Sequence, residues 1–494
     1  TVDTLRTCVP ETDRIHQRAA QDTQRQSPTL FASRITRYIV ITEVDMSQDR
    51  KQATRQRWLE LLQSHRADFD AAGSEQFWSP TRDCASRDEL RALQNEKLKV
   101  LTPFLYENSD FYRHRFDSLR LTPADIQTVD DLLKWPPVDK KEMVEDLMAN
   151  PPWGTYTTHN DALWNERGWS LFTTSGTTGL PRVFRYSKFD LEQWRWANAR
   201  ALWSLGARRG DSVFLVVGFG PHVWAWGVHQ ALAHMGIPCI PGGGMTAEMR
   251  CNIIERYKPT ILATLPSQLL RLGRVMQGLG LDPARSSIKT LFTGGEPAAG
   301  ISTTRARLED LWGARLVEFY GCTEASPHSG GYSCPASSLP GQQVHTHLME
   351  DFQIWELVDP DTLKPVAEGE RGITICTNMN SESSSQLRFI VGDYTTFNSS
   401  PCDCGRTHVR AMGGFSGRAD DLINLRGLKF YPSIIEEAVR AVAGVGDEYD
   451  ATIETNKAGI DVMTVRVEHA DLTHFLSALR VPHQSVFALL LFEV

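Results

Sequence analysis

The sequence lacks several features that mark broad classes of protein. No apolar run reaches the roughly 18–20 residues that a membrane-spanning helix needs, and no secretory signal is recognisable at its beginning. Basic residues do not dominate either, because the formal net charge is −8, which argues against nucleic acid as an electrostatic partner. We therefore expect a cytoplasmic enzyme that binds neither a membrane nor nucleic acid.

Cysteine is also scarce: the nine cysteines among 494 residues are scattered and odd in number. This usage is typical of reduced thiols in an intracellular enzyme rather than of a disulfide framework. Apolar residues are plentiful instead. They make up 41% of the chain, which is enough to build buried cores in roughly two to four domains.

The character of the sequence changes along the chain. Residues 1–45 are polar and irregular. We interpret them as an appended or weakly ordered segment, with an ordinary extra N-terminal element as the alternative. From Trp169 to about Leu316, short β-branched or aromatic runs that end in glycine or proline alternate with helical stretches. That alternation predicts an α/β domain built on a mostly parallel sheet.

A different pattern follows that region. Residues 346–400 are typical of β-hairpins, which predicts a β-rich subdomain. After Gly417 the sequence predicts a hairpin and then a helix. We therefore expect a large N-terminal domain over residues 46–417 and a small α+β domain over residues 418–494.

One stretch, "LFTTSGTTGLPRVFRYS" (Leu171–Ser187), concentrates small hydroxyl residues and glycine. Glycine lets the backbone approach a ligand closely, and successive backbone N–H groups in such turns can surround an anion. Arg182 and Arg185 add positive charge, so a triphosphate is the ligand that this composition favours. The spacing of a Walker P-loop is absent, and on composition alone a plain linker is the alternative. The candidate phosphate-binding residues are Thr174, Ser175, Gly176, Thr177, Thr178 and Gly179.

Further stretches follow this loop in order: "TGGEP", "EFYGCTEAS", "RFIVGDY" and "GRADDLINLRGLKFYPSIIEE". Together with "TTSGTTGLPR", they resemble the motifs of the adenylate-forming superfamily, which includes acyl-CoA synthetases, luciferases and the adenylation domains of peptide synthetases. The stretch "CDCGRTHVR" (Cys402–Arg410) resembles the cysteine-rich segment of the phenylacetate–CoA ligase-like branch. The resemblance covers roughly residues 90–470 and does not cover residues 1–45.

This resemblance implies a two-step reaction. A carboxylate attacks the α-phosphate of ATP to give an acyl-adenylate and pyrophosphate, and the thiol of coenzyme A then displaces AMP. Charge builds on phosphate oxygens in the first step, where hydrogen-bond donors and Mg²⁺ would stabilise it. Thr174 and Ser175 could donate, and Thr323 would contact the α-phosphate. Glu324 would coordinate Mg²⁺, because a hard cation prefers carboxylate oxygen.

The resemblance also implies the other nucleotide contacts. Tyr320 would stack on adenine, and Asp393 would accept both ribose hydroxyls. Arg418 would lie close to ribose and phosphate, with a salt bridge between Asp393 and Arg418 as the alternative. Asp420 would be the pivot about which a mobile small domain rotates between the two half-reactions. The remaining candidates are Gly294, Gly295, Glu296, Pro297 and Gly321 for the nucleotide and Gly427 for the thiol tunnel, where a tight turn is the alternative.

Two stretches, "GFGPHVWAWGVHQ" and "PGGGMTAEM", fall where the branch binds its carboxylic acid. Their large side chains could bury an aromatic or other bulky acid, although tryptophans on a helix also often belong to the core. The candidate substrate-binding residues are Phe219, Trp224, Trp226, Gly243 and Met245.

A cluster of cysteine and histidine suggests a metal. Cys402 and Cys404 are spaced C-x-C, Cys334 lies upstream, and His345 or His347 follows it. Thiolate and imidazole together suit a closed, tetrahedral structural Zn²⁺ site, and "HLMEDF" resembles the branch's segment in a way that favours His347 over His345. The predicted ligands are therefore Cys334, His347, Cys402 and Cys404, with buried free thiols as the alternative.

One residue typical of the superfamily has no counterpart in the sequence. A lysine near the C-terminus usually stabilises charge during adenylation, but the last lysine here is Lys457. Arg182, moreover, stands where the phosphate loop often carries lysine. Either a tail of about one hairpin is absent from the sequence, or the protein lacks this lysine.

Several functions therefore stay open beside an ATP-dependent acid–CoA ligase. The protein could form only the thioester, from a ready-made adenylate, or pass the acyl group to the phosphopantetheine of a carrier protein. It could also be a non-catalytic protein that binds a nucleotide or an acid. The sequence does not indicate an oligomeric state.

Overall fold

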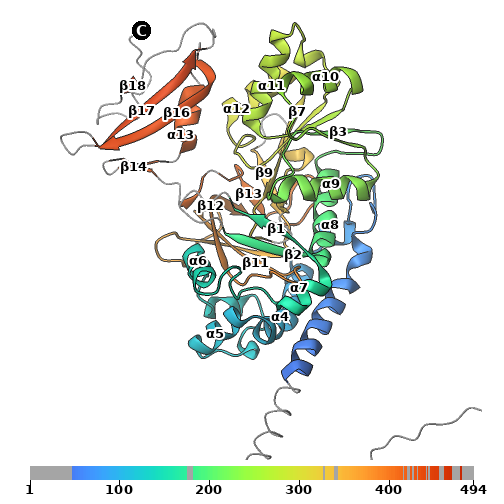
Figure 1. Cartoon of the computed structure of the whole chain (residues 1–494), viewed down its shortest axis with the longest axis vertical. Coiled ribbons are helices and arrows are strands. Elements are labelled where there is room, and N and C mark those ends of the chain that lie inside the picture. Colours follow the sequence, from blue (N-terminus) through green and yellow to red (C-terminus); the bar gives the residue numbers. More distant parts are fainter. Residues whose placement is uncertain are drawn as a thin grey trace, which may run out of the picture. The chain divides into compact units, whose positions relative to one another are not determined.

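The computed structural model describes residues 47–174, 182–325, 329–338 and 343–415, and then 417–419, 423–425, 428–430, 432–440, 442, 445–455, 461–469 and 479–480. The chain divides into two compact units, Thr1–Gln56 and Arg57–Val494. In the first unit the described residues, 47–56, are helical. The predicted N-terminal segment 1–45 lies outside the described residues, and everything below concerns the second unit (Figure 1).

Helices precede the sheet in the second unit. Helical residues 57–64 contribute Trp58 and Leu62 to a buried core that they share with α4 (Arg87–Asn108) and α5 (Asp110–Leu119). Helix α4 begins with a capping box, in which Glu89 N donates to Ser86 Oγ and Ser86 N donates to Glu89 Oε2. The helices of this region are α3 (Pro80–Asp83), α4 (Arg87–Asn108), α5 (Asp110–Leu119), α6 (Lys140–Ala149) and α7 (Asp161–Arg167).

An eleven-stranded sheet forms the centre of this unit, in the order β10-β11-β12-β13-β9-β8-β7-β6-β5-β3-β4. Its parallel part confirms the predicted α/β region and consists of β3 (Val213–Leu215), β4 (Cys239–Pro241), β5 (Ile261–Ala263), β6 (Thr290–Thr293) and β7 (Arg315–Gly321). Its antiparallel part includes the predicted β-rich region and consists of β8 (Ser329–Tyr332), β9 (His345–Leu348), β10 (Gln353–Val358), β11 (Arg371–Asn378), β12 (Phe389–Asn398) and β13 (Arg410–Met412).

Helices cover both faces of the parallel part (Figure 1). Val213 and Leu215 of β3 belong to one core, with residues of α8 (Lys188–Ser204) and α9 (Val223–Met235). Phe214, between them, belongs to a second core, with residues of α10 (Ala247–Tyr257), α11 (Pro266–Gly278) and α12 (Ser302–Trp312). Successive side chains of a strand point to opposite faces, so strands buried on both faces read as continuous apolar runs.

A separate two-stranded hairpin carries the hydroxyl–glycine loop. Strand β1 (Trp169–Thr173) pairs antiparallel with β2 (Val183–Ser187), and Thr173 lies opposite Val183. Ser187, the last residue of β2, is also the N-cap of helix α8 and accepts a hydrogen bond from Asp190 N. The helix therefore follows the strand directly. The hairpin therefore fixes both ends of the loop against a buried helix.

The C-terminal elements confirm the predicted hairpin followed by a helix. They are β14 (Ile423–Leu425), β15 (Leu428–Phe430), α13 (Pro432–Arg440), β16 (Val445–Thr455), β17 (Asp461–His469) and β18 (Leu479–Arg480). Ile435 and Val439 of α13 form a small core with Met463 and Val465 of β17. Across the described residues, no helix combines the length and the apolarity that crossing a membrane would take.

Candidate active site

The base of the hydroxyl–glycine loop is closed by two reciprocal hydrogen bonds. Thr174 N donates to the Arg182 carbonyl oxygen at 3.1 Å, and Arg182 N donates to Thr174 Oγ1 at 3.3 Å. These contacts hold the two ends of the loop together where the hairpin strands end. Several predicted site residues lie outside the described residues, namely Ser175, Gly176, Thr177, Thr178, Gly179, Asp420 and Gly427.

The side chain of Arg182 forms an ion pair with Glu324, which follows β7. Both side chains are about nine-tenths buried, with exposed fractions of 10% and 7%. The backbone beside Glu324 is held by Tyr186, whose hydroxyl donates to the Thr323 carbonyl oxygen at 2.5 Å. The predicted phosphate loop and the predicted metal carboxylate therefore meet in the fold, although the two residues lie 142 positions apart.

The predicted adenine and ribose residues also meet. The Tyr320 hydroxyl donates to Asp393 Oδ2 at 2.6 Å, and Arg418 Nε lies 3.9 Å from Asp393 Oδ1. The salt bridge that the sequence left as an alternative is therefore present. Phe415 stacks on the Tyr320 ring, with ring centroids 3.4 Å apart. Sequence reasoning missed Phe415, which lies two residues before the Gly417 that opens the hinge motif.

The "TGGEP" segment leaves the end of β6, next to the end of β7, where open α/β sheets bind ligands. A Cβ on Gly294 would lie 2.9 Å from the Phe319 carbonyl oxygen, which explains why glycine is needed there. Gly295 has a φ of +81°, in the left-handed region that favours glycine. Glu296 accepts hydrogen bonds from Ser267 N and Ser267 Oγ at the start of α11, so it anchors the segment.

A buried carboxyl group anchors the same segment from β7. Glu318 Oε1 accepts a hydrogen bond from Ala298 N at 3.2 Å, one residue after Pro297. Burial raises the pKa of Glu318 to about 7. Glu318 and Glu296 therefore hold the predicted adenine segment from two sides.

The predicted aromatic substrate residues form two pairs of ring contacts near the start of α9. The rings of Phe219 and Trp226 meet edge to face, with centroids 5.2 Å apart. Trp224 packs on Phe292 of β6 at 5.9 Å, and a Cβ on Gly294 would lie 3.7 Å from Trp224 Cζ2. Trp224 is thus adjacent to the predicted adenine segment.

The segment after β4, which carries Gly243 and Met245, completes this region. A Cβ on Gly243 would lie 2.7 Å from the Val217 carbonyl oxygen, so only glycine fits there. Met245 N donates to the Gly242 carbonyl oxygen at 3.5 Å, which folds the segment after β4 back on itself. Both predicted residues therefore lie on a tight turn that follows a parallel strand.

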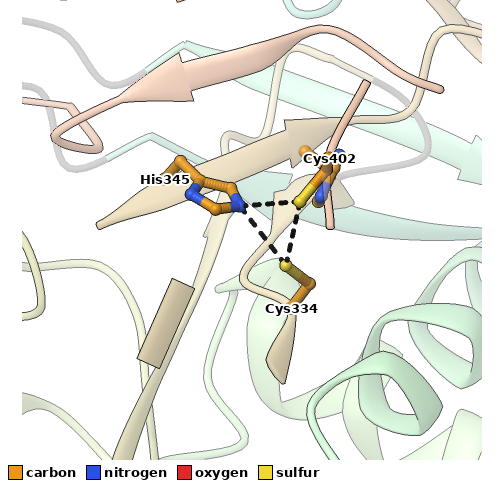
Figure 2. Close-up of side chains that lie close together, drawn as sticks. Cys334, His345 and Cys402 are labelled. Atoms are coloured by element: carbon orange, nitrogen blue, oxygen red, sulfur yellow. Dashed lines mark hydrogen bonds between the residues drawn. The ribbon is translucent and has the colours of Figure 1, made fainter. Parts of the chain in front are cut away.

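Figure 2 shows Cys334 and Cys402, two of the predicted metal ligands, beside His345, and His347, a third predicted ligand, belongs to the same cluster. His345 Nε2 lies 3.3 Å from both Cys334 Sγ and Cys402 Sγ, and these two sulfurs are 3.8 Å apart. Cys404 Sγ lies 3.4 Å from His347 Nε2. His345, which the sequence comparison with the branch passed over, thus contacts two of the predicted thiols. Both histidines are on β9, where alternation places them on the same face.

The two histidines of this cluster are in the form that binds a metal. Burial lowers the pKa of His345 to about 4 and also lowers the pKa of His347. Both imidazoles are therefore neutral at pH 7, which is the form that binds a metal. The ligand atoms of Cys334, His345, His347 and Cys402 all lie within 4.8 Å of one another.

An arginine enclosed by tryptophans supports the loop from β2. The Arg185 guanidinium lies 4.4 Å from the Trp153 ring, 4.6 Å from Trp164 and 5.8 Å from Trp169. Its carbonyl oxygen accepts hydrogen bonds from the hydroxyls of Ser383 and Ser384. Burial lowers its pKa. The Arg185 guanidinium is therefore enclosed by three tryptophan rings.

Replacing Arg185 by methionine should lower the free energy of unfolding by about 2 kcal/mol, because a desolvated cation–π contact is lost while the apolar stem is kept. Chemical denaturation measures the change. Arg256→Met is the matched control, since Arg256 lies 5.7 Å from one exposed ring, that of Tyr257. Equal losses of unfolding free energy in the two variants would contradict a special role for the three tryptophan rings around Arg185.

Known proteins are similar to this chain in sequence. The sequence matches the AMP-binding enzyme family over residues 118–379 and the AMP-binding enzyme C-terminal domain over residues 427–485. Phenylacetate-coenzyme A ligase from Thermus thermophilus is 30% identical over 392 residues, which cover 79% of this chain and 84% of the relative. Phenylacetate-coenzyme A ligase from Escherichia coli is 29% identical over 388 residues, covering 78% and 84%.

A solved structure has a similar fold. 2-Hydroxyisobutyryl-CoA ligase, in the postadenylation state in complex with 2-HIB-AMP, superimposes with a TM-score of 0.74 at 27% identity. The similarity covers 81% of this chain and 82% of that chain. The same ligase has also been solved with 2-HIB-AMP and CoA in the thioesterification state, with a TM-score of 0.67 at 27% identity.

Proposed function

We propose the class of acid on which this chain acts. The chain belongs to the AMP-binding enzyme family and joins an acid to coenzyme A through an acyl-adenylate. Its acid, in this proposal, is aromatic or otherwise bulky and apolar. The observation that carries this proposal is the position of Trp224 between Phe292 and the adenine segment at Gly294. Phe219 and Trp226 form a second aromatic pair near the start of α9. The names of the curated relatives, phenylacetate-coenzyme A ligases, point to the same class of acid.

The buried residues have separate tasks in this proposal. Glu324 would hold Mg²⁺, and the bound ion would supply positive charge to neutralise phosphate oxygens. Thr174 and Thr323 donate to phosphate oxygens, and Asp393 accepts the ribose hydroxyls. Tyr320 orients the Asp393 carboxylate through its 2.6 Å hydrogen bond, which leaves the second carboxylate oxygen to face the ribose and Arg418.

A panel of acids tests the proposed substrate class. Phenylacetate and benzoate should give the highest kcat/KM for acyl-CoA formation, measured by the appearance of AMP and of the thioester. Cyclohexylacetate is a size-matched control without a π system, and 2-hydroxyisobutyrate tests the small, polar acid named for the structural relative. A preference for 2-hydroxyisobutyrate would overturn the aromatic assignment. Formation of the thioester with CoA also distinguishes this acceptor from a carrier protein.

Removing the charge of Asp393 should weaken the binding of ATP without lowering the stability of the fold. Burial raises the pKa of Asp393, although Arg418 and Tyr320 partly offset the effect. A carboxyl group with a raised pKa binds its proton more tightly in the folded state, so its charge destabilises the fold above that pKa and stability rises as the pH falls through it.

Asp393→Asn should therefore keep or raise the thermal midpoint at pH 7, with a difference from the wild type that shrinks as the pH falls. The KM for ATP should rise roughly 10- to 100-fold, since a charged hydrogen-bond acceptor is lost. Thermal unfolding between pH 4 and 8 and steady-state kinetics measure the two effects. A destabilised variant that keeps its affinity for ATP would contradict the ribose assignment.

We further propose that the cysteine–histidine cluster holds a structural Zn²⁺. A tetrahedral ion with Zn–S bonds of about 2.3 Å requires sulfurs about 3.8 Å apart, and the Cys334 and Cys402 sulfurs are 3.8 Å apart. Cys334, His345 and Cys402 would supply three ligands, with His347 or Cys404 as the fourth. All these side chains are buried, as expected for a closed site without an open position for substrate.

A further inference from the structure

The carboxylate assigned to Mg²⁺ is covered in this structure by a residue of the phosphate loop. Arg182 donates through Nη2 to Glu324 Oε1, and its guanidinium lies 5.6 Å from the Phe389 ring. The other terminal nitrogen, Nη1, is buried and has no hydrogen-bond partner among the described residues. Arg182 therefore uses one terminal nitrogen on the carboxylate and leaves a second buried donor unused.

We propose that Arg182 is a removable cap on Glu324. Without nucleotide it neutralises the buried carboxylate. When ATP and Mg²⁺ bind, the Arg182 guanidinium leaves Glu324, whose carboxylate would then hold the cation, and turns to the polyphosphate. This inference rests on the proposed function, because it takes Glu324 as the metal carboxylate.

Charge pairing supports the exchange. A buried carboxylate without a partner is costly, so Glu324 needs a cation whether or not nucleotide is present. Two cations on one carboxylate would repel each other, so Mg²⁺ and Arg182 compete for it. A guanidinium presents a planar fork of donors that matches phosphate geometry. When Arg182 turns to the phosphate, Glu324 is paired with Mg²⁺ and Arg182 with the polyphosphate, so no charged group is left without a partner.

The position of Arg182 in the chain allows this movement. Its backbone is fixed to Thr174 at the base of the loop, while its long side chain reaches Glu324 beyond β7. A rotation of the side chain alone changes its partner, without a rearrangement of the hairpin. The cap therefore couples the two ligands: ATP strengthens metal binding at Glu324, and the metal strengthens ATP binding by the same factor.

The test measures metal binding without nucleotide, so that it does not depend on turnover. Mn²⁺, which is followed by electron paramagnetic resonance, serves as the probe for the divalent cation. Arg182→Gln should bind Mn²⁺ roughly fivefold more tightly, or better, than the wild type, while its KM for ATP should rise. Arg182→Lys keeps the charge but not the fork, and should show a smaller change of the same sign.

Arg115→Gln is the matched control. Arg115 also forms an ion pair with a glutamate, Glu142, and also lies 5.6 Å from an aromatic ring, that of Trp135. It should change neither the affinity for Mn²⁺ nor the KM for ATP. An Arg182→Gln variant that folds and binds nucleotide-free Mn²⁺ no more tightly than the wild type would overturn the cap, and so would an equal gain in Arg115→Gln.

Glu324→Gln separates the cap from the function on which it rests. If this variant keeps normal Mg²⁺-dependent adenylation, the assignment of Glu324 to the metal fails, and the cap fails with it. If adenylation is lost but Arg182→Gln shows no tighter Mn²⁺ binding, the cap alone is wrong. The cap is supported when adenylation is lost and the gain in Mn²⁺ affinity from Arg182→Gln disappears in the double variant.

Discussion

Replacing Glu324 by glutamine should slow acyl-adenylate formation roughly 100-fold or more, because a metal ion contributes several kcal/mol of charge stabilisation to the transition state. Glutamine has nearly the same shape, so the change removes charge and little volume. The Glu324 backbone carbonyl would still accept from Asn378 Nδ2. The amide would keep a neutral acceptor for Arg182, so the fold should persist with a modest loss of stability.

Pyrophosphate exchange into ATP measures this step directly. Glu356→Gln is the matched control, since Glu356 forms a buried ion pair with Arg388 that resembles the pair between Glu324 and Arg182. The control should lose a similar amount of stability and keep most of its exchange activity. A Glu324→Gln variant with exchange close to the wild-type rate would exclude Glu324 as the metal ligand.

Replacing Cys402 by serine should remove the bound Zn²⁺ and lower the free energy of unfolding by about 4 kcal/mol or more, the range typical of a lost structural metal. Cys402 contacts both His345 and Cys334, so its loss removes the shared thiolate of the cluster. Chelation of the wild-type protein should produce the same loss, because binding energy at such a site is folding energy.

Metal analysis together with thermal unfolding tests this prediction. Cys251→Ser is the control, because Cys251 is buried in the core between the sheet and α10 and lies outside the cluster. It should lose some packing energy and leave the metal content unchanged. Purified wild-type protein without zinc, with a thermal midpoint that chelators do not change, would show that the cluster consists of free thiols.

Local patterns were sufficient to predict most of the fold. Each of the five parallel strands was indicated by a short apolar run that ends at glycine or proline. The runs of β3 and β5 are continuous because these strands are buried on both faces. The hairpin between β10 and β11 was also indicated by strand–turn–strand spacing. Both signals are local, so no knowledge of distant contacts was needed.

The contacts that define the site were less predictable. The pair between Arg182 and Glu324 joins residues 142 positions apart, and sequence alone does not show which cation a carboxylate meets. His345 and His347 point to the same side of β9, so spacing could not choose between them. The stacking of Phe415 on Tyr320 depends on how the chain returns after β13, which no periodic pattern encodes.

The most direct test of the central claim is acid-dependent exchange of pyrophosphate into ATP in the presence of Mg²⁺. We predict robust exchange with phenylacetate or a related aromatic acid. We predict none without acid, because no acyl-adenylate then forms for pyrophosphate to reverse. Folded protein that binds an acyl-adenylate and converts it to the thioester, yet shows no exchange with any acid, would contradict the two-step account. The protein would then be an enzyme that forms only the thioester.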